Sequence, residues 1–392
     1  MSTIKVNRIE NTSTTDGGVS IDVDGHVTID GQQLPTAGPL SNRNLIINGA
    51  MTVSQRSTSN AGQTATAYRA CDRFQTGIDS LGTWTVSQAA SAPAGFSKSL
   101  KMECTTANAS PSAGSFAAIF YTIEAQDLQL LNYGTANAEV VQLSFWVRSN
   151  KTGSASFAVR QRDNSDKLFS KVYNFNSTAD TWKKIEIEIP ADTAGVINDD
   201  NGQGLTLAWW LNSGSNFTGG GATTGWEALD NTKRNPTNAG IGGTVNDYFE
   251  ITGVQLEIGS KATPFEHESY GQTLAKCQRY CQSLGGDSFK QIAGAMRATT
   301  TTAKGQLKLV TTMRATPTGS TVGSGSFRFQ SGDDVLGGDV DFISLWTAGS
   351  DHNVVWVDWA PGSGTFGGSA KDYGMMYCNN GATRKLVLSA EL

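Results

Sequence analysis

Short runs of alternating hydrophobic and polar residues recur along most of the chain and predict β-strands. Between residues 41 and 265 these runs fall at 45–47, 84–86, 100–102, 117–123, 140–147, 155–159, 172–175, 182–189, 205–211 and 248–256. A period of two places one face of each strand in a core. About ten strands without intervening helices favour a jelly-roll β-sandwich, and the lack of a fixed repeat disfavours a β-helix.

A second set of alternating runs predicts another β domain at residues 286–392. The runs fall at 291–295, 305–310, 327–329, 340–346, 354–359, 373–377 and 386–388. In VVWVDWAP, Val355 and Trp359 share one face and Trp356 and Asp358 share the other, so both faces look half-buried. A buried contact between subunits explains this pattern as well as a glycan site does. Long Gly-, Ser- and Asp-rich loops on a rigid scaffold make this domain the expected recognition tip.

The first 40 residues predict an extended β segment. Alternation from Val19 to Ile29 surrounds Asp24–Gly25, which is a strong hairpin signal. A hairpin of this size is not stable alone, so we expect it to dock on another domain or to pair among three copies of the chain.

A hydrophobic stripe between the two domains predicts a connecting helix at residues 266–285. The residues of the stripe recur at spacings of four, three, four and three. They are Tyr270, Leu274, Cys277, Cys281 and Leu284. The stripe is heptad-like, so it predicts contacts along the axis of a homotrimer, with packing of each copy on its own sandwich as the alternative.

Composition narrows the choice of partners. The chain has 392 residues, enough for two or three domains, with 38% hydrophobic residues, 17% charged residues and 44 glycines. Its net charge of -5, without clustered Lys or Arg, disfavours nucleic acid as a partner. No apolar run resembles a secretory signal or a membrane span, so we expect synthesis in a cytosol and no membrane insertion. The five cysteines are expected to be buried and reduced.

Four segments carry a resemblance to a known family. The sequence FEITGVQLEIGSKATPFEHESYGQTLAKCQRYCQ, with the opening NLIINGAMTVSQR near residue 44 and the closing LVLSAEL, resembles tail fibre proteins of tailed bacteriophages. The start, MSTIKVNRIE, resembles fibre proteins of phages that infect marine cyanobacteria. The resemblance implies a homotrimeric receptor-binding protein of the virion. It would attach to phage tail or adaptor proteins by residues 1–40 and contact a glycan or protein at the host surface.

The opening NLIING and the closing strand are also similar to the jelly-roll carbohydrate-binding modules of secreted glycoside hydrolases. In those modules the opening continues into an acidic residue that helps to hold a structural calcium. Ala50, Met51 and Thr52 stand at that place here, and Asp247 alone matches an acidic position. One carboxylate is too few for a cation that takes six or more oxygens, so no metal or cofactor is assigned.

Aromatic faces that the pattern does not bury are the candidates for saccharide binding. In LTLAWWLN, Trp209 lies on the core face and Trp210 on the other. The long polar loop that follows contains Phe217 and Trp226, and Trp226 either pins this loop or binds a ligand. In the terminal domain, the candidates are Trp346 and the adjoining loop residues Asp351 and His352.

No set of residues predicts catalysis. The three histidines lie in different regions, and Glu186 and Glu188 alternate with isoleucines as on the solvent face of a strand. We therefore expect a binding protein and no enzyme. Two alternatives stay open: a glycan-depolymerising tailspike with a carboxylate pair, and a structural virion fibre, on head or tail, without receptor binding.

Overall fold

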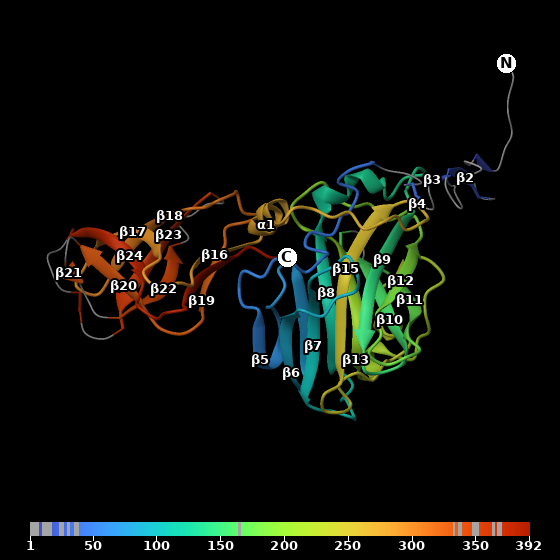
Figure 1. Ribbon diagram of the computed structural model, residues 1–392, viewed down its shortest axis with the longest axis horizontal. Coiled ribbons are helices and arrows are strands. Elements are labelled where there is room, and N and C mark those ends of the chain that lie inside the picture. The colour runs from blue at the N-terminus through green and yellow to red at the C-terminus, as the bar shows by residue number, and fades with distance from the viewer. Residues whose placement is uncertain are drawn as a thin grey trace, which may run out of the picture.

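The computed structural model describes residues 8–9, 18–22, 27–29, 32–34, 39–163, 166–331, 334–335, 339–346, 353–362, 365–366 and 371–392. A β-sandwich and a smaller β domain lie end to end and meet beside helix α1 (Tyr270–Gln278), and a small N-terminal sheet lies at the other side of the sandwich (Figure 1). The expected class is confirmed: the chain is mainly β, with a jelly-roll sandwich, a second β domain, a short helix between them and an extended N-terminal β segment. No helix in the described ranges is long and apolar enough to cross a membrane.

Eleven antiparallel strands form the sandwich, in the order β12-β9-β15-β7-β6-β8-β13-β10-β11-β14, with β5 beside β6. They are β5 (Ser59–Tyr68), β6 (Phe74–Ala89), β7 (Ser99–Thr106), β8 (Phe116–Glu124), β9 (Val141–Ser149), β10 (Gly153–Gln161), β11 (Lys167–Asn176), β12 (Lys183–Ile189), β13 (Gln203–Ser213), β14 (Glu227–Ala228) and β15 (Tyr248–Ile258). Three 3-10 turns, η1 (Ala125–Leu131), η2 (Ser215–Phe217) and η3 (Asn231–Lys233), lie in the connections.

The sheet becomes a two-layered sandwich because β6 changes its partner. Residues 74–79 of β6 pair with β8, and residues 83–89 pair with β7. At the bend between these halves, Ser80 and Gly82 have φ angles of 49° and 69°. A Cβ on Gly82 would lie 2.0 Å from the carbonyl oxygen of Thr106, so only glycine fits the corner.

Aromatic side chains from both layers fill the core. Trp209 on β13 lies 5.8 Å, centroid to centroid, from Phe145 on β9, and it also contacts Phe74 and Phe157. All four are fully buried, as the alternation of the strands predicted for Trp209. These edge-on and tilted ring contacts join the two layers.

The second domain contains a three-stranded and a seven-stranded sheet. The first has the order β16-β25-β19, with β16 (Cys281–Gly285), β19 (Thr318–Val322) and β25 (Lys385–Ser389). The second contains β17 (Gln291–Arg297), β18 (Ala303–Lys308), β20 (Phe327–Ser331), β21 (Asp334–Val335), β22 (Val340–Trp346), β23 (Val354–Pro361) and β24 (Tyr373–Cys378). Val355, Val357 and Trp359 are fully buried between the sheets. One of the expected Gly- and Ser-rich loops, at residues 316–325, is in part a strand, because residues 318–322 pair with β25.

The predicted helix at 266–285 is too long. Helix α1 begins at Tyr270 and ends at Gln278, and the side chain of its N-cap residue, Ser269, forms a capping box with Gln272. Residues 281–285 are instead strand β16, paired with residues 385–389 of β25. Cys281 and Leu284 therefore do not continue the helix stripe, because pairing with a distant strand overrides the local periodicity.

The N-terminal sheet confirms the predicted hairpin. Strands β2 (Val19–Ile21) and β3 (Val27–Ile29) pair antiparallel, and β1 (Arg8–Ile9) and β4 (Gln32–Gln33) flank them. The Asp24–Gly25 turn lies outside the described residues. Ile21 and Ile29 are 42% and 43% exposed, so this sheet leaves apolar side chains at its surface.

Candidate functional site

The opening NLIING packs against the closing strand of the sandwich. The side-chain oxygen of Asn44 accepts hydrogen bonds from the backbone N–H groups of Ile46 (3.0 Å) and Leu256 (3.1 Å), and its Nδ2 donates to the carbonyl of Val254 (3.2 Å). Asn48, with a φ of 63°, bonds to both backbone groups of Val53. The amides of this motif therefore serve the fold.

Arg43 ties the same opening to the segment before α1. Its Nε donates to the hydroxyl of Thr263 (2.9 Å) and lies 3.3 Å from the buried carboxylate of Glu257. The opening NLIING and the segment that begins with FEITG, which both carry the resemblance to phage fibres, are thus one structural unit.

Asp247 is held by the fold as well. One of its carboxylate oxygens accepts from the backbone N–H groups of Gly242 (3.0 Å) and Thr244 (2.9 Å) and lies 3.2 Å from Nζ of Lys151. Within the described ranges, no group of three or more His, Cys, Asp or Glu side chains is placed to hold a metal ion. Asp247 alone gives no basis for assigning calcium.

Trp210 is not open to a ligand, contrary to the prediction. It is 1% exposed on the outer face of the sheet, under Phe217, whose ring centroid lies 5.2 Å away, and under Arg234, whose guanidinium lies 4.9 Å from the indole centroid. The alternation correctly placed Trp210 away from the core. The segment 214–235 nevertheless covers this outer face, because its Phe217 packs on a small apolar cluster of strand residues that includes Trp210.

The loop aromatics have different roles. Phe217 remains half-buried at the edge of that cluster. Trp226 packs beside Tyr133 and Phe169, and its indole N–H donates to the carbonyl of Pro190 (2.7 Å). Trp226 therefore pins the loop to the sandwich, which was one of the two alternatives.

The predicted contact residues at the tip are Trp346, Asp351 and His352. Asp351 and His352 lie outside the described residues, and so does the side chain of Trp346. The backbone of Trp346 ends strand β22 opposite Trp356 of β23.

The stripe predicted for trimer contact is divided between inside and outside. Tyr270 is 59% exposed and Leu274 half-buried, but Cys277 and Cys281 are fully buried within one chain. Leu284 packs on the core of the second domain. Cys277 and Cys281 are thus corrected to contacts within one chain, because α1 and β16 pack against their own domains.

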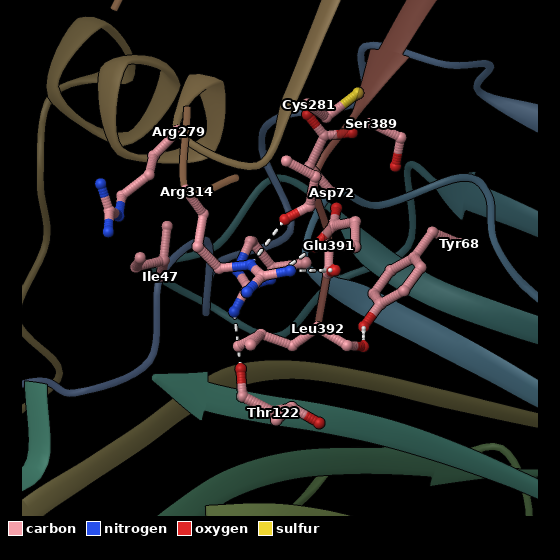
Figure 2. Close-up of polar contacts among 12 residues, drawn as sticks. Ile47, Tyr68, Asp72, Thr122, Arg279, Cys281, Arg314, Ser389, Glu391 and Leu392 are labelled. Carbon is pink, nitrogen blue, oxygen red and sulfur yellow. Dashed lines mark hydrogen bonds and ion pairs between the residues drawn. The ribbon is translucent and has the colours of Figure 1, made fainter. Parts of the chain in front are cut away.

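A buried network of charges joins the two domains (Figure 2). The Glu391 carboxylate pairs with Arg73 and with Arg56, whose Nη2 lies 3.3 Å away. The guanidinium of Arg73 also stacks over the ring of Tyr280, 3.4 Å from its centroid, and donates to the carbonyl of Thr122 (2.6 Å). Burial opposes the charged form of Arg73, but the Glu391 carboxylate outweighs this and raises the pKa of Arg73.

Other buried acids of the chain are also paired. Both oxygens of Glu124 accept from Arg279, each at 2.8 Å, and Asp192 pairs with Lys167 (2.7 Å). Glu186 and Glu188 are exposed on β12, as predicted.

A polar groove of about 510 Å³ lies between the edges of β11 and β12. Its rim carries both signs of charge, and Lys184 pairs with Glu186 (2.8 Å). Nζ of Lys183 donates to the carbonyl of Asn174 (2.7 Å), so a side chain already covers part of the β11 edge.

An apolar trough of about 380 Å³ lies on the outer face of the seven-stranded sheet. The strand register places Gly294 of β17 between Met375 of β24 and Gln306 of β18, and it places Gln306 opposite Trp356. Nothing lies within 4 Å of the position of a Cβ on Gly294, so the floor of the trough is open.

Two aromatic side chains stand at the trough. Tyr373 is 74% exposed and lies opposite Met296, while Trp356 is half-buried on the far side. Lys304 and Gln306 add polar groups to the lining. From the sequence, the face of Trp356 was assigned either to a contact between subunits or to a glycan site, and Tyr373 was not identified. The available signal was Gly294 and Gly374, because a glycine within a strand can mark a place where a ligand or another backbone approaches closely.

No protein-family model and no curated protein matches the chain. Similar solved structures include an enzymatically active domain of bacteriophage CBA120 tailspike protein 4 (13% identity, TM-score 0.28). The match covers 55% of this chain and 22% of that chain. Another match, to a putative sugar-binding protein from Bacteroides thetaiotaomicron (13% identity, TM-score 0.31), covers 55% of this chain and 100% of that chain. A third match, to the module TmCBM61 solved with β-1,4-galactotriose (12% identity, TM-score 0.26), covers 56% of this chain and 100% of that chain. Similarities this weak say nothing about the ligand of this chain.

Proposed function

We propose that this protein is a bacteriophage tail fibre that binds a saccharide at the host surface, without catalysis, through the trough of its C-terminal domain. The observation that carries the proposal is that Trp356 and Tyr373 both line the trough, on opposite sides of its open floor at Gly294. The resemblance to phage tail fibres of NLIINGAMTVSQR, LVLSAEL and the segment that begins with FEITG supports the proposal that the protein is part of the virion.

The chemistry of the trough suits a sugar. Aromatic faces pack on the C–H patches of a pyranose ring, and Lys304 and Gln306 offer donors to its hydroxyl groups. A volume of about 380 Å³ is in the range of small-ligand sites. The described lining contains no carboxylate, which favours binding over hydrolysis.

The same proposal includes a homotrimer held together in part by the N-terminal sheet. This sheet is too small to be stable alone, and it exposes Ile9, Ile21 and Ile29. Pairing among three copies would cover these side chains, while residues 1–40 attach the fibre to tail or adaptor proteins. Synthesis would take place in the host cytoplasm.

The test is a glycan microarray probed with the full chain and with Trp356→Ala and Tyr373→Ala. Each substitution should lower binding to the preferred saccharide by about tenfold, because truncating a central aromatic contact removes one of the strongest interactions of a site. Phe289→Ala is the control, since Phe289 is an exposed aromatic residue of the same domain and lies outside the trough lining. Binding that survives both trough substitutions, or a wild-type chain that binds no saccharide, would favour the structural virion fibre.

A further inference from the structure

Three arginines cluster on the outer face of the sandwich, away from the trough. The side chain of Arg160, near the end of β10, donates from Nε to Asp166 (3.1 Å) and pairs with it a second time through Nη2. Nη1 of Arg162 lies 3.8 Å from the same carboxylate. Arg234 reaches this region from the segment 214–235, stacked on Trp210 and Phe217.

The cluster has more positive than negative charge. Asp166 pairs with Arg160 and Arg162, whereas no ion pair joins Arg234 to an acid within the described part of the chain. The Nε of Arg234 is buried and, among the described residues, has no hydrogen-bond partner. Burial, followed by repulsion from Arg160, lowers the pKa of Arg234 to about 10, so its guanidinium remains charged at neutral pH. An anion here would relieve this repulsion, because guanidinium groups bind carboxylate and sulfate oxygens in pairs.

The surroundings favour a sugar as the carrier of that anion. The half-buried ring of Phe217 adjoins Arg234, whose guanidinium lies 5.4 Å from the ring centroid. Asn231 is exposed, and its side-chain oxygen accepts from Arg234 (3.3 Å). An aromatic ring, an amide and guanidinium groups together can meet the ring face, the hydroxyls and the acid group of an acidic sugar. The net charge of -5 of the whole chain opposes a nucleic acid in the same place.

We propose that Arg160, Arg162 and Arg234 bind the carboxylate or sulfate ester group of an acidic saccharide, with Phe217 packing beside the sugar ring. This site is distinct from the trough, lies in a different domain, and does not depend on the function proposed for the trough.

The test measures binding of the full chain to four soluble probes: dextran sulfate, oligogalacturonate, unsubstituted dextran and duplex DNA. The substituted residue is Arg162, because it is half-exposed and its one ion pair is long, so Arg162→Gln leaves the cluster beneath intact. Loss of one charge-assisted contact should weaken binding of the preferred acidic probe by about tenfold. The matched control is Arg148→Gln on β9, which also removes a partly exposed arginine from an ion pair, with Glu250.

A second variant, Arg234→Lys, keeps the charge but loses the planar fork of donors. It should also weaken binding, whereas Trp356→Ala in the trough should leave it unchanged. The preferred acidic probe, sulfated or uronic, identifies the anion. The proposal is overturned if neither acidic probe binds more tightly than dextran, if Arg148→Gln weakens binding as much as Arg162→Gln, or if duplex DNA binds equally well.

Discussion

At the scale of single residues, Gly49 shows how closely the opening motif lies against β15. A Cβ built on Gly49 would lie 2.0 Å from the carbonyl oxygen of Val254, which is a backbone atom that cannot turn away. The same opening carries the hydrogen bonds of Asn44 and Asn48, so a shift here would disturb them too.

We expect Gly49→Ala to lower the free energy of unfolding by about 3 kcal/mol, as overpacking of a tight contact does. Thermal or denaturant unfolding measures this. Gly271→Ala, in helix α1 with nothing within 4 Å of its Cβ position, is the matched control and should be neutral or slightly stabilising. Equal behaviour of the two variants would contradict the role given to the motif.

Burial at single positions was predictable where it depended on a strand's own pattern. Trp209 follows the alternation into the core, as predicted, whereas Trp359, for which the alternation left both faces half-buried, is fully buried. Trp210 does not follow it to the solvent, because a segment of the chain that begins only a few residues later folds back over it. Such cover depends on tertiary contacts, and the pattern of one strand contains no information about them.

At the scale of elements, the change from helix to strand after Gln278 depends on contacts to both domains. Arg279 bonds to both oxygens of the buried Glu124 at the end of β8, and the next residues enter β16. Burial opposes ionisation of Glu124, but the bonds from Arg279 and Tyr280 outweigh it, and the pKa of this carboxyl is lowered below 4.5.

Because the pKa of Glu124 is lower in the folded chain, its ionised form adds stability above its ordinary pKa, and this contribution is lost as the pH falls through the folded pKa. Arg279→Ala should therefore lower the free energy of unfolding by about 2 kcal/mol near neutral pH, and by progressively less in acid. Unfolding curves across that range test the sign. Lys290→Ala, which breaks an exposed pair with Asp287, should have no measurable effect at any pH.

Elements with strong alternation were predicted well, and elements defined by a distant partner were not. Strand β22 has the predicted limits, and β15 extends them by two residues. Strands β16 and β19 were missed because both are specified by pairing with β25, about a hundred and about sixty residues further along the chain, respectively. Of the candidate binding surface, only Trp356 was considered from sequence, since the trough forms when four strands come together.

At the scale of the whole molecule, the joint between the domains depends on charge. Glu391 enters from the second domain and meets Arg56 and Arg73 of the sandwich (Figure 2). Nη1 of Arg314, also in the second domain, donates to the carbonyl of Asn201 in the sandwich (2.9 Å). A paired buried charge is tolerated, but removing one partner leaves the other without compensation.

Glu391→Gln should therefore destabilise the chain by about 3 kcal/mol or more and loosen the domains from each other. Unfolding curves and limited proteolysis between the domains provide the measurements. Glu186→Gln, at an exposed position on β12, is the control. A Glu391→Gln variant as stable and as protease-resistant as wild type would show that apolar contacts alone hold the joint.

Saccharide-dependent adhesion is measured most directly by the binding of the labelled full-length chain to susceptible bacterial cells, comparing wild type, Trp356→Ala and Phe289→Ala. We expect wild type and Phe289→Ala to bind equally, Trp356→Ala to lose about tenfold in affinity, and periodate oxidation of the cell-surface glycans to abolish binding. Undiminished adhesion of Trp356→Ala, or adhesion that survives removal of the glycans, would show that the trough does not bind a host saccharide.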